Sequence, residues 1–172
     1  QNSVVITQPA QALSVVATRT NVSCNGGNDG TVTANASGGT APYTFLWAPI
    51  NQQGQTITGL LPGIYSVKAT DGNGCQSSSQ TITIFQPNAL SITSSTTNSS
   101  CGLANGTATV VVSGGTGPFT YQWSPSGGTA PTATGLLSGS YSVLVKDGNN
   151  CNSTKIVNVN DNNGPSVSII GI

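Results

Sequence analysis

The sequence predicts an all-β protein built from two tandem antiparallel β-sandwich modules. It contains 172 residues, of which 35% are hydrophobic, and it repeats itself after about 76 positions. Short runs in which apolar residues alternate with Ser or Thr predict half-buried strands. Clusters of Gly, Pro, Asn and Asp separate these runs, and no stretch has a helical period. Strands of this length and spacing are typical of a two-sheet sandwich.

The internal repeat defines the modules. Residues 37–42 (SGGTAP) recur as residues 113–118 (SGGTGP), and Trp47 returns as Trp123. We expect module 1 at residues 10–87 and module 2 at residues 88–164. Residues 1–9 resemble the closing strand of a module and residues 165–172 an opening strand. We therefore expect these two segments to belong to a preceding and a following module of a longer array.

The alternation of apolar residues predicts which side chains form the core. In module 1 we expect strands at residues 12–18, 31–37, 42–48, 55–58, 63–70 and 79–85. Successive side chains of a strand face opposite sides. The expected inward positions in module 1 are Val32, Ala34, Ala36, Tyr43, Phe45, Trp47, Tyr65, Val67, Ala69, Ile82 and Ile84. Those in module 2 are Ala108, Val110, Val112, Phe119, Tyr121, Trp123, Tyr141, Val143 and Val145.

The aromatic residues allow two interpretations, core packing or a platform on which sugars stack. Tyr43-x-Phe45 of module 1 becomes Phe119-x-Tyr121 in module 2, so ring volume is kept while the hydroxyl moves. This favours packing, because recognition would depend on the position of the hydroxyl. Tyr65 follows a Leu-x-x-Gly-x run at the start of a strand. That is the pattern of a tyrosine corner and predicts Ig-like (PKD-like) modules.

Composition excludes several classes of function. Charged residues make up 5% of the chain and the net charge is zero, so we expect no binding to nucleic acid. No apolar run reaches the roughly 20 residues that span a bilayer. The chain has no histidine and only four acidic residues, Asp29, Asp71, Asp147 and Asp161. Acid–base pairs and activated nucleophiles are therefore scarce, and we expect no enzymatic activity.

Each module contains two cysteines, and we expect the disulfides Cys24–Cys75 and Cys101–Cys151. A module of about 76 residues buries a limited core and gains from a covalent link. The alternative is a zinc site, which the absence of histidine and of CxxC spacing disfavours. Disulfides indicate an oxidising, extracytoplasmic location.

Calcium is the one metal for which the sequence offers candidate ligands. If Cys24 bonded to Cys75, the loops on either side would come together with the oxygens of Asn28, Asp29, Asp71 and Asn73. Calcium prefers six to eight oxygen ligands, and two carboxylates are few. Module 2 also has Asn105 in place of Asp29. The favoured interpretation is that these residues form turns, and we expect no cofactor.

The motifs together resemble the SprB-type repeat of cell-surface adhesins from gliding Bacteroidota. They are CNGG-x-DG at 24–30, SGGT-x-P-aromatic-x-aromatic-x-W at 37–47, L-x-x-G-x-YSV at 60–67 and DG-x-x-C at 71–75. Module 2 departs from the first motif at residues 101–106. The resemblance implies type IX secretion, a cell-surface location and a role in adhesion or gliding motility, with no catalytic residues.

Three functions remain open at this stage. The leading hypothesis is a structural spacer, or stalk, in a long adhesin or filament, whose partners are the neighbouring modules of the same chain. The alternatives are a module that binds surface polysaccharide and a subunit that assembles with copies of itself into a fibre. The last would use edge strands, which here carry few of the charges that normally protect edges.

Overall fold

The computed structural model of the chain describes residues 11–162 and residue 164. These residues contain strands and turns, and among them no helix is long and apolar enough to cross a membrane. The chain divides into two compact units, Gln1–Gln86 and Pro87–Ile172. Pro87, which we expected to close module 1, therefore falls in module 2. The expected flanking strands at residues 1–9 and 165–172 lie outside the described residues.

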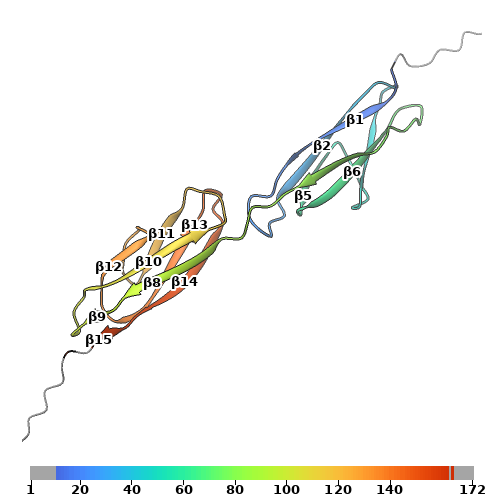
Figure 1. The fold of residues 1–172 in the computed structure, drawn as a ribbon. Coiled ribbons are helices and arrows are strands. Elements are labelled where there is room, and N and C mark those ends of the chain that lie inside the picture. Colours follow the sequence, from blue (N-terminus) through green and yellow to red (C-terminus); the bar gives the residue numbers. More distant parts are fainter. Residues whose placement is uncertain (1–10, 163, 165–172) are drawn as a thin grey trace, which may run out of the picture. The chain divides into compact units, whose positions relative to one another are not determined.

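Module 1 is a sandwich of two antiparallel sheets (Figure 1). One sheet has the order β1-β2-β5 and the other β4-β3-β6-β7. The strands are β1 (Ser14–Thr20), β2 (Gly30–Ser37), β3 (Thr44–Ala48), β4 (Gln52–Gln53), β5 (Thr56–Leu60), β6 (Gly63–Thr70) and β7 (Gln80–Ile84). The six expected strands are present with ends shifted by up to two residues. The sequence did not predict β4, a two-residue strand that pairs with β3.

Module 2 repeats this arrangement with the sheets β12-β10-β8 and β11-β13-β14. A short parallel pair, β9 with β15, is added beside them. The strands are β8 (Ser91–Thr97), β9 (Ser99–Ser100), β10 (Gly106–Ser113), β11 (Thr120–Ser124), β12 (Thr132–Leu136), β13 (Gly139–Lys146), β14 (Asn152–Val159) and β15 (Asp161–Asn162). The predicted all-β, tandem Ig-like architecture is confirmed.

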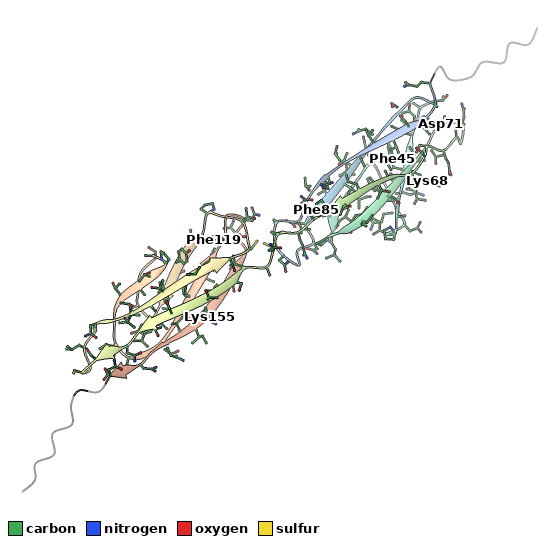
Figure 2. All side chains as sticks on the ribbon, in the orientation of Figure 1. Phe45, Lys68, Asp71, Phe85, Phe119 and Lys155 are labelled. Atoms are coloured by element: carbon green, nitrogen blue, oxygen red, sulfur yellow. The ribbon has the colours of Figure 1, made fainter. Side chains whose placement is uncertain are left out.

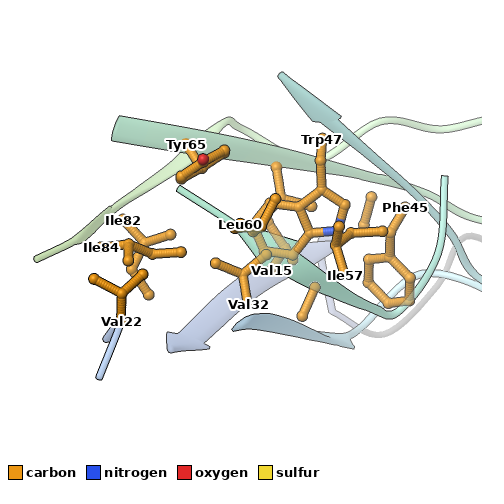
Figure 3. Close-up of a cluster of buried hydrophobic side chains, with 13 residues drawn as sticks. Val15, Val22, Val32, Phe45, Trp47, Ile57, Leu60, Tyr65, Ile82 and Ile84 are labelled. Atoms are coloured by element: carbon orange, nitrogen blue, oxygen red, sulfur yellow. The ribbon is translucent and has the colours of Figure 1, made fainter. Parts of the chain in front are cut away.

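Each module has its own hydrophobic core between its two sheets. In module 1 the ring of Trp47 lies at the centre of the cluster, next to Leu60, Val15 and Ile57 (Figure 3). In module 2 Trp123 takes this position and is 5% exposed. Most of the expected inward residues are buried, and Ala36, Tyr43, Val112, Phe119 and Tyr121 are partly buried at the margins. Alternation therefore identified the inward faces correctly.

The tyrosine corner is present in both modules. The Tyr65 hydroxyl donates to the Leu61 carbonyl at 2.9 Å, and the Tyr141 hydroxyl donates to the Leu137 carbonyl at 3.1 Å. Both rings are buried, at 7% exposure. Each hydroxyl therefore ties the start of β6 or β13 to the turn that precedes it.

The Tyr65→Phe variant should unfold at a temperature lower by roughly 4–8 °C. The change removes one hydrogen bond, worth about 1 kcal/mol, and leaves the Leu61 carbonyl without this donor. Calorimetry of the whole chain measures the shift. Tyr121→Phe is the matched control, because no described hydrogen bond is made by the hydroxyl of this partly buried tyrosine. Equal shifts in the two variants would contradict the assigned role.

Candidate functional site

The residues that the sequence singled out gather at the two ends of each module. We call the end at which the chain comes into the sandwich the N-terminal end, and the end at which it leaves the C-terminal end. In module 1 the Gly39 N–H donates to the Gln11 carbonyl at the N-terminal end. At the C-terminal end the Val22 N–H donates to the Phe85 carbonyl. Figure 2 shows Asp71 and Phe85 at these opposite ends of module 1.

A buried aspartate organises the N-terminal end. Asp71 follows β6 directly and is 5% exposed. Its carboxylate accepts hydrogen bonds from the backbone N–H groups of Thr40, Asn73 and Cys75, at 3.0, 3.0 and 2.8 Å. Asp71 therefore joins the β6–β7 loop to the Gly38–Gly39 turn.

Asp147 makes the same three contacts in module 2. It accepts from the N–H groups of Thr116, Asn149 and Cys151, each at 2.9 Å. Like Asp71, Asp147 is 5% exposed, so the contacts and the burial are both repeated. The repetition in both modules indicates a role in folding, because each oxygen is already used by the protein backbone.

The hydrogen bonds lower the pKa of both carboxyl groups. For Asp71 the N–H groups of Cys75 and Thr40 have the largest influence and lower the pKa despite burial. For Asp147 burial is the largest single influence and raises the pKa. The N–H groups of Thr116, Cys151 and Asn149 together outweigh it, so the pKa is lowered overall. Both aspartates therefore favour the ionised form in the folded protein.

The midpoint of thermal unfolding should fall as the pH drops below about 4. A carboxyl group whose pKa is lower in the folded state stabilises the fold above its unfolded pKa of about 3.9. That contribution is lost as the pH falls through the lowered value of the folded state. In the Asp71→Asn/Asp147→Asn variant the difference in melting temperature between pH 7 and pH 2 should shrink. A difference equal to that of the original chain would contradict the assignment.

The C-terminal end is braced by a different loop. The carboxylate of Asp29 accepts from both the N–H and the hydroxyl of Ser23, and the Ser23 hydroxyl and N–H lower the pKa of Asp29. In module 2 Asn105 takes over this position. Its side-chain oxygen accepts from the Ser100 N–H at 2.9 Å, and its amide donates to the Ser100 hydroxyl at 2.7 Å. The Asn105 amide thus makes two hydrogen bonds to Ser100, as the Asp29 carboxylate does to Ser23.

The candidate calcium ligands are not brought together. Asp29 and Asn28 lie in the loop at the C-terminal end of module 1, whereas Asp71 and Asn73 lie in the loop at its N-terminal end. The side chain of Asn73 donates to the Thr40 hydroxyl at 3.1 Å. No group of three His, Cys, Asp or Glu residues suited to a metal occurs among the described residues. The four candidate side chains therefore do not form one shared site, and those of Asp29 and Asp71 are bonded within their own loops.

The two expected disulfides are also wrong, and for the same geometric reason. Within the described part of the chain Cys75 and Cys101 are free, exposed thiols, so Cys24–Cys75 and Cys101–Cys151 are not formed. The Cys75 N–H is held by Asp71 at the N-terminal end of module 1. Cys24 lies at the C-terminal end, where its carbonyl accepts from the Gly27 N–H. The eight residues of β6 separate these ends by roughly 25 Å, whereas disulfide-bonded Cα atoms lie within about 7 Å.

The buried aromatic residues form the core and not a sugar platform. Trp47 is fully buried, and its indole N–H donates to the Gly54 carbonyl at 3.0 Å. The Trp123 indole donates to the Ala130 carbonyl at 2.9 Å. Phe45 is 8% exposed. The packing interpretation is confirmed for these residues.

Two shallow hollows lie on the outer surface of the modules. In module 1 the hollow lies over β3 and β4 and is lined by Tyr43, Thr44, Phe45, Gln53, Gly54 and Gln55. In module 2 it lies over β11 and β13 and is lined by Thr120, Tyr121, Gln122, Thr129, Leu144 and Lys146. The polar residues of the two linings differ, with two glutamines in the first and one glutamine and a lysine in the second. Tyr43, Phe45 and Tyr121, which the sequence offered as a possible sugar platform, contribute to these linings.

Strand order, tyrosine corner and buried tryptophan together define the protein as a tandem segment of Ig-like β-sandwich modules. The family model of the SprB repeat matches residues 16–52 and 93–128, one segment in each module. One segment in each module is therefore similar to the SprB repeat, as the motifs predicted. This match supports the expectation of a cell-surface repeat protein.

Comparison with solved structures gives distant similarity. A complex of Dpr11 IG1 with DIP-gamma IG+IG2 is 13% identical, with a TM-score of 0.40, over 88% of this chain and 99% of that one. A C-terminal fragment of intimin, solved with the intimin-binding domain of its translocated receptor, is 17% identical, with a TM-score of 0.43, over 87% of this chain and 64% of that one. Domains 1–6 of the surface layer protein SbsC are 18% identical, with a TM-score of 0.34, over 94% of this chain and 29% of that one. No curated protein matches the chain.

Proposed function

We propose that this chain is a non-catalytic structural spacer in a long, secreted cell-surface adhesin or filament that serves surface attachment or gliding. One observation carries the proposal. In each module the chain comes in at one end of the sandwich and leaves at the opposite end. Modules joined in this way each add about 25 Å of strand length to the array. The SprB repeat supports a cell-surface location, and the proposal extends this to export through type IX secretion in a gliding Bacteroidota.

The use of the polar side chains supports a spacer. The three aspartates and the asparagine that brace the loops direct their oxygens to the backbone or to Ser23 and Ser100. These side chains therefore already have hydrogen-bond partners within their own module. The chain carries four basic and four acidic residues, so its surface has little charge with which to attract other polymers.

Electron microscopy of the parent filament tests the spacer function. Deletion of one repeat, residues 11–86, should shorten the projection by a fixed increment, and deletion of residues 11–162 by about twice as much. Attachment should persist in both deletion strains. Loss of attachment after deletion of a single module, with the remaining modules folded, would contradict a spacer.

A second candidate function, polysaccharide binding, rests on the hollows beside β3 and β11. Tyr43 and Tyr121 line them and are partly exposed, and an aromatic ring with neighbouring amides can hold a sugar. A glycan array with the whole chain distinguishes the two functions. A spacer gives no specific signal, whereas a binding module gives a signal that Tyr43→Ala or Tyr121→Ala reduces.

A further inference from the structure

The outer face of the three-stranded sheet in module 1 carries a grid of threonines. The central strand β2 lies between β1 and β5 (Figure 1), and each strand contributes two threonines separated by one residue. Successive side chains of a strand face opposite sides, so both threonines of a strand share the outer face. The residues between them in β2 and β5, Val32 and Ile57, are buried in the core. The six threonines, which we call the hydroxyl grid of module 1, are Thr18, Thr20, Thr31, Thr33, Thr56 and Thr58.

Module 2 carries the same grid on the corresponding sheet, β12-β10-β8. Its only difference in residue type is Ser95, which stands where module 1 has Thr18 and keeps the hydroxyl. The hydroxyl grid of module 2 consists of Ser95, Thr97, Thr107, Thr109, Thr132 and Thr134. The grid is therefore a property of the repeat and not of one module.

The registers of the strands align the grid residues in rows across the sheet. Thr18 lies opposite Thr33, which in turn lies opposite Thr56, and Thr20 lies opposite Thr31. Neighbouring strands lie about 4.8 Å apart, and alternate residues of one strand about 6.7 Å apart. The hydroxyl groups of each grid thus repeat at two fixed distances along two directions.

Hydrogen bonds between the hydroxyl groups hold the grid side chains in place. The hydroxyl oxygens of Thr20 and Thr31 are 2.7 Å apart, and those of Thr33 and Thr56 are 3.0 Å apart. The equivalent pairs of module 2 are 2.8 and 3.0 Å apart. A hydroxyl has one donor and two acceptor lone pairs, so each pair keeps an O–H group for a further partner. Because threonine is also stiff at χ1, the free hydrogen-bonding groups point in fixed directions.

The two grids contain no charged residue. The three lysines belong to strands of the other sheets, β6, β13 and β14. Arg19 lies in β1 but on its opposite side, where its guanidinium group is 4.9 Å from the centroid of the Phe85 ring. The four aspartates lie outside the six strands that form the grids. Each grid therefore offers only methyl and hydroxyl groups.

This composition argues against the usual macromolecular partners. Protein interfaces are enriched in aromatic residues, Met and Arg and are depleted in Ser. Sugars stack on aromatic rings, and membrane surfaces attract large apolar side chains together with basic ones. The grids have none of these groups. What distinguishes them is the regular spacing of small, uncharged groups that hydrogen-bond with water.

We propose that the hydroxyl grids bind ice. Oxygen atoms at the surface of ice form a lattice with repeat distances of a few ångströms, and each makes hydrogen bonds in fixed directions. Rows of fixed hydroxyl and methyl groups hold water molecules in a similar order, whereas a charged side chain would orient the nearby water around itself. The proposal goes beyond the spacer function and does not depend on it, because each grid lies within a single module.

Slow freezing of a solution of the whole chain tests the proposal. Ice is grown on a cooled metal probe in the stirred solution, and tryptophan absorbance compares the protein in the ice with the protein left in the liquid. The chain should be enriched several-fold in the ice relative to serum albumin frozen in the same way. Exclusion of the chain from the ice to the same extent as albumin would overturn the proposal.

Lysine substitutions at the centre of the grids identify the face that binds. In Thr33→Lys/Thr109→Lys the enrichment in ice should be lost, because each grid then carries a charged side chain on its central strand. The matched control is Thr81→Lys/Thr154→Lys, which adds the same two charges to the outer faces of the other sheets. The control should be enriched in ice as strongly as the original chain. Equal losses in the two variants would overturn the assignment to the grids.

A second variant keeps the test valid if the central substitutions prevent folding, which circular dichroism detects. Thr18 and Ser95 are exposed and lie on edge strands, so Thr18→Lys/Ser95→Lys should fold and should also lose the enrichment. A glycan array provides the alternative outcome. A sugar signal that either grid variant abolishes, without enrichment of the original chain in ice, would assign the face to a polysaccharide and overturn the proposal.

Discussion

The Trp47→Ala variant should strongly destabilise module 1 and leave the stability of module 2 unchanged. Trp47 is packed on all sides within the core, with 0% solvent exposure, and its indole N–H is bonded to Gly54. Truncation of a buried tryptophan costs about 3–5 kcal/mol. A module of this size has a stability of roughly 4–11 kcal/mol, so the loss removes a large part of it.

The two tryptophans make this prediction easy to follow, because each module contains one. In Trp47→Ala the fluorescence of Trp123 reports on module 2 alone, and its urea transition should be that of the original chain. Circular dichroism should show a separate transition for module 1 at much lower urea. Trp123→Ala is the mirror experiment. A simultaneous loss of both modules in either variant would contradict separate cores.

Local sequence patterns were sufficient to predict the sandwich and its core. The alternation over residues 31–37 identified Val32 and Ala34 as buried, and both are 0% exposed. The Leu-x-x-Gly-x-Tyr pattern identified the Tyr65 hydrogen bond. These features depend on neighbours in the chain or on the strand period, which a single sequence contains.

The end of the module at which each loop lies could not be predicted, because it depends on how many times the chain passes along the module before that loop. The sequence predicts four strands between Cys24 and Cys75. Each strand takes the chain once along the module, so four strands would return it to the end at which Cys24 lies. The structure adds β4, whose two residues, Gln52 and Gln53, pair with β3. With β4 the chain passes along module 1 five times between Cys24 and Cys75, so Cys75 lies at the opposite end. In module 2 the chain also reverses between β11 and β12, but residues 125–131, which make this reversal, form no strand. Such short reversals, with or without a strand, left no signal in the sequence, and they place the two cysteines of each module at opposite ends.

The two glycines after β2 and β10 should be the least replaceable small residues of the chain. Gly114 has a φ of 71°, a left-handed conformation that residues with a Cβ rarely adopt. A Cβ at this position would lie 2.0 Å from the Ala89 carbonyl oxygen, and one at Gly38 would lie 2.2 Å from the Ala12 carbonyl oxygen. The first residues of each module thus pack directly against the glycine backbone.

The Gly114→Ala variant should destabilise module 2 by about 3 kcal/mol or more. The left-handed conformation alone costs about 1–2 kcal/mol for alanine, and the contact with Ala89 must be relieved by moving backbone. Hydrogen exchange of module 2 peptides measures the loss and should leave module 1 protected. Because Ala89 lies just before β8, the residues before β8 should lose protection first.

Two control glycines separate the conformational cost from the steric one. Gly128 has a φ of 79° and open space within 4 Å of the position that a Cβ would take, so Gly128→Ala should cost only about 1–2 kcal/mol. Gly117 has open space and no left-handed φ, and Gly117→Ala should be nearly neutral. Equal losses in Gly114→Ala and Gly128→Ala would show that conformation, and not the close approach of Ala89, makes the glycine necessary. Losses that decrease in the order Gly114, Gly128, Gly117 would instead show that the close approach of Ala89 makes Gly114 necessary at the N-terminal end of module 2.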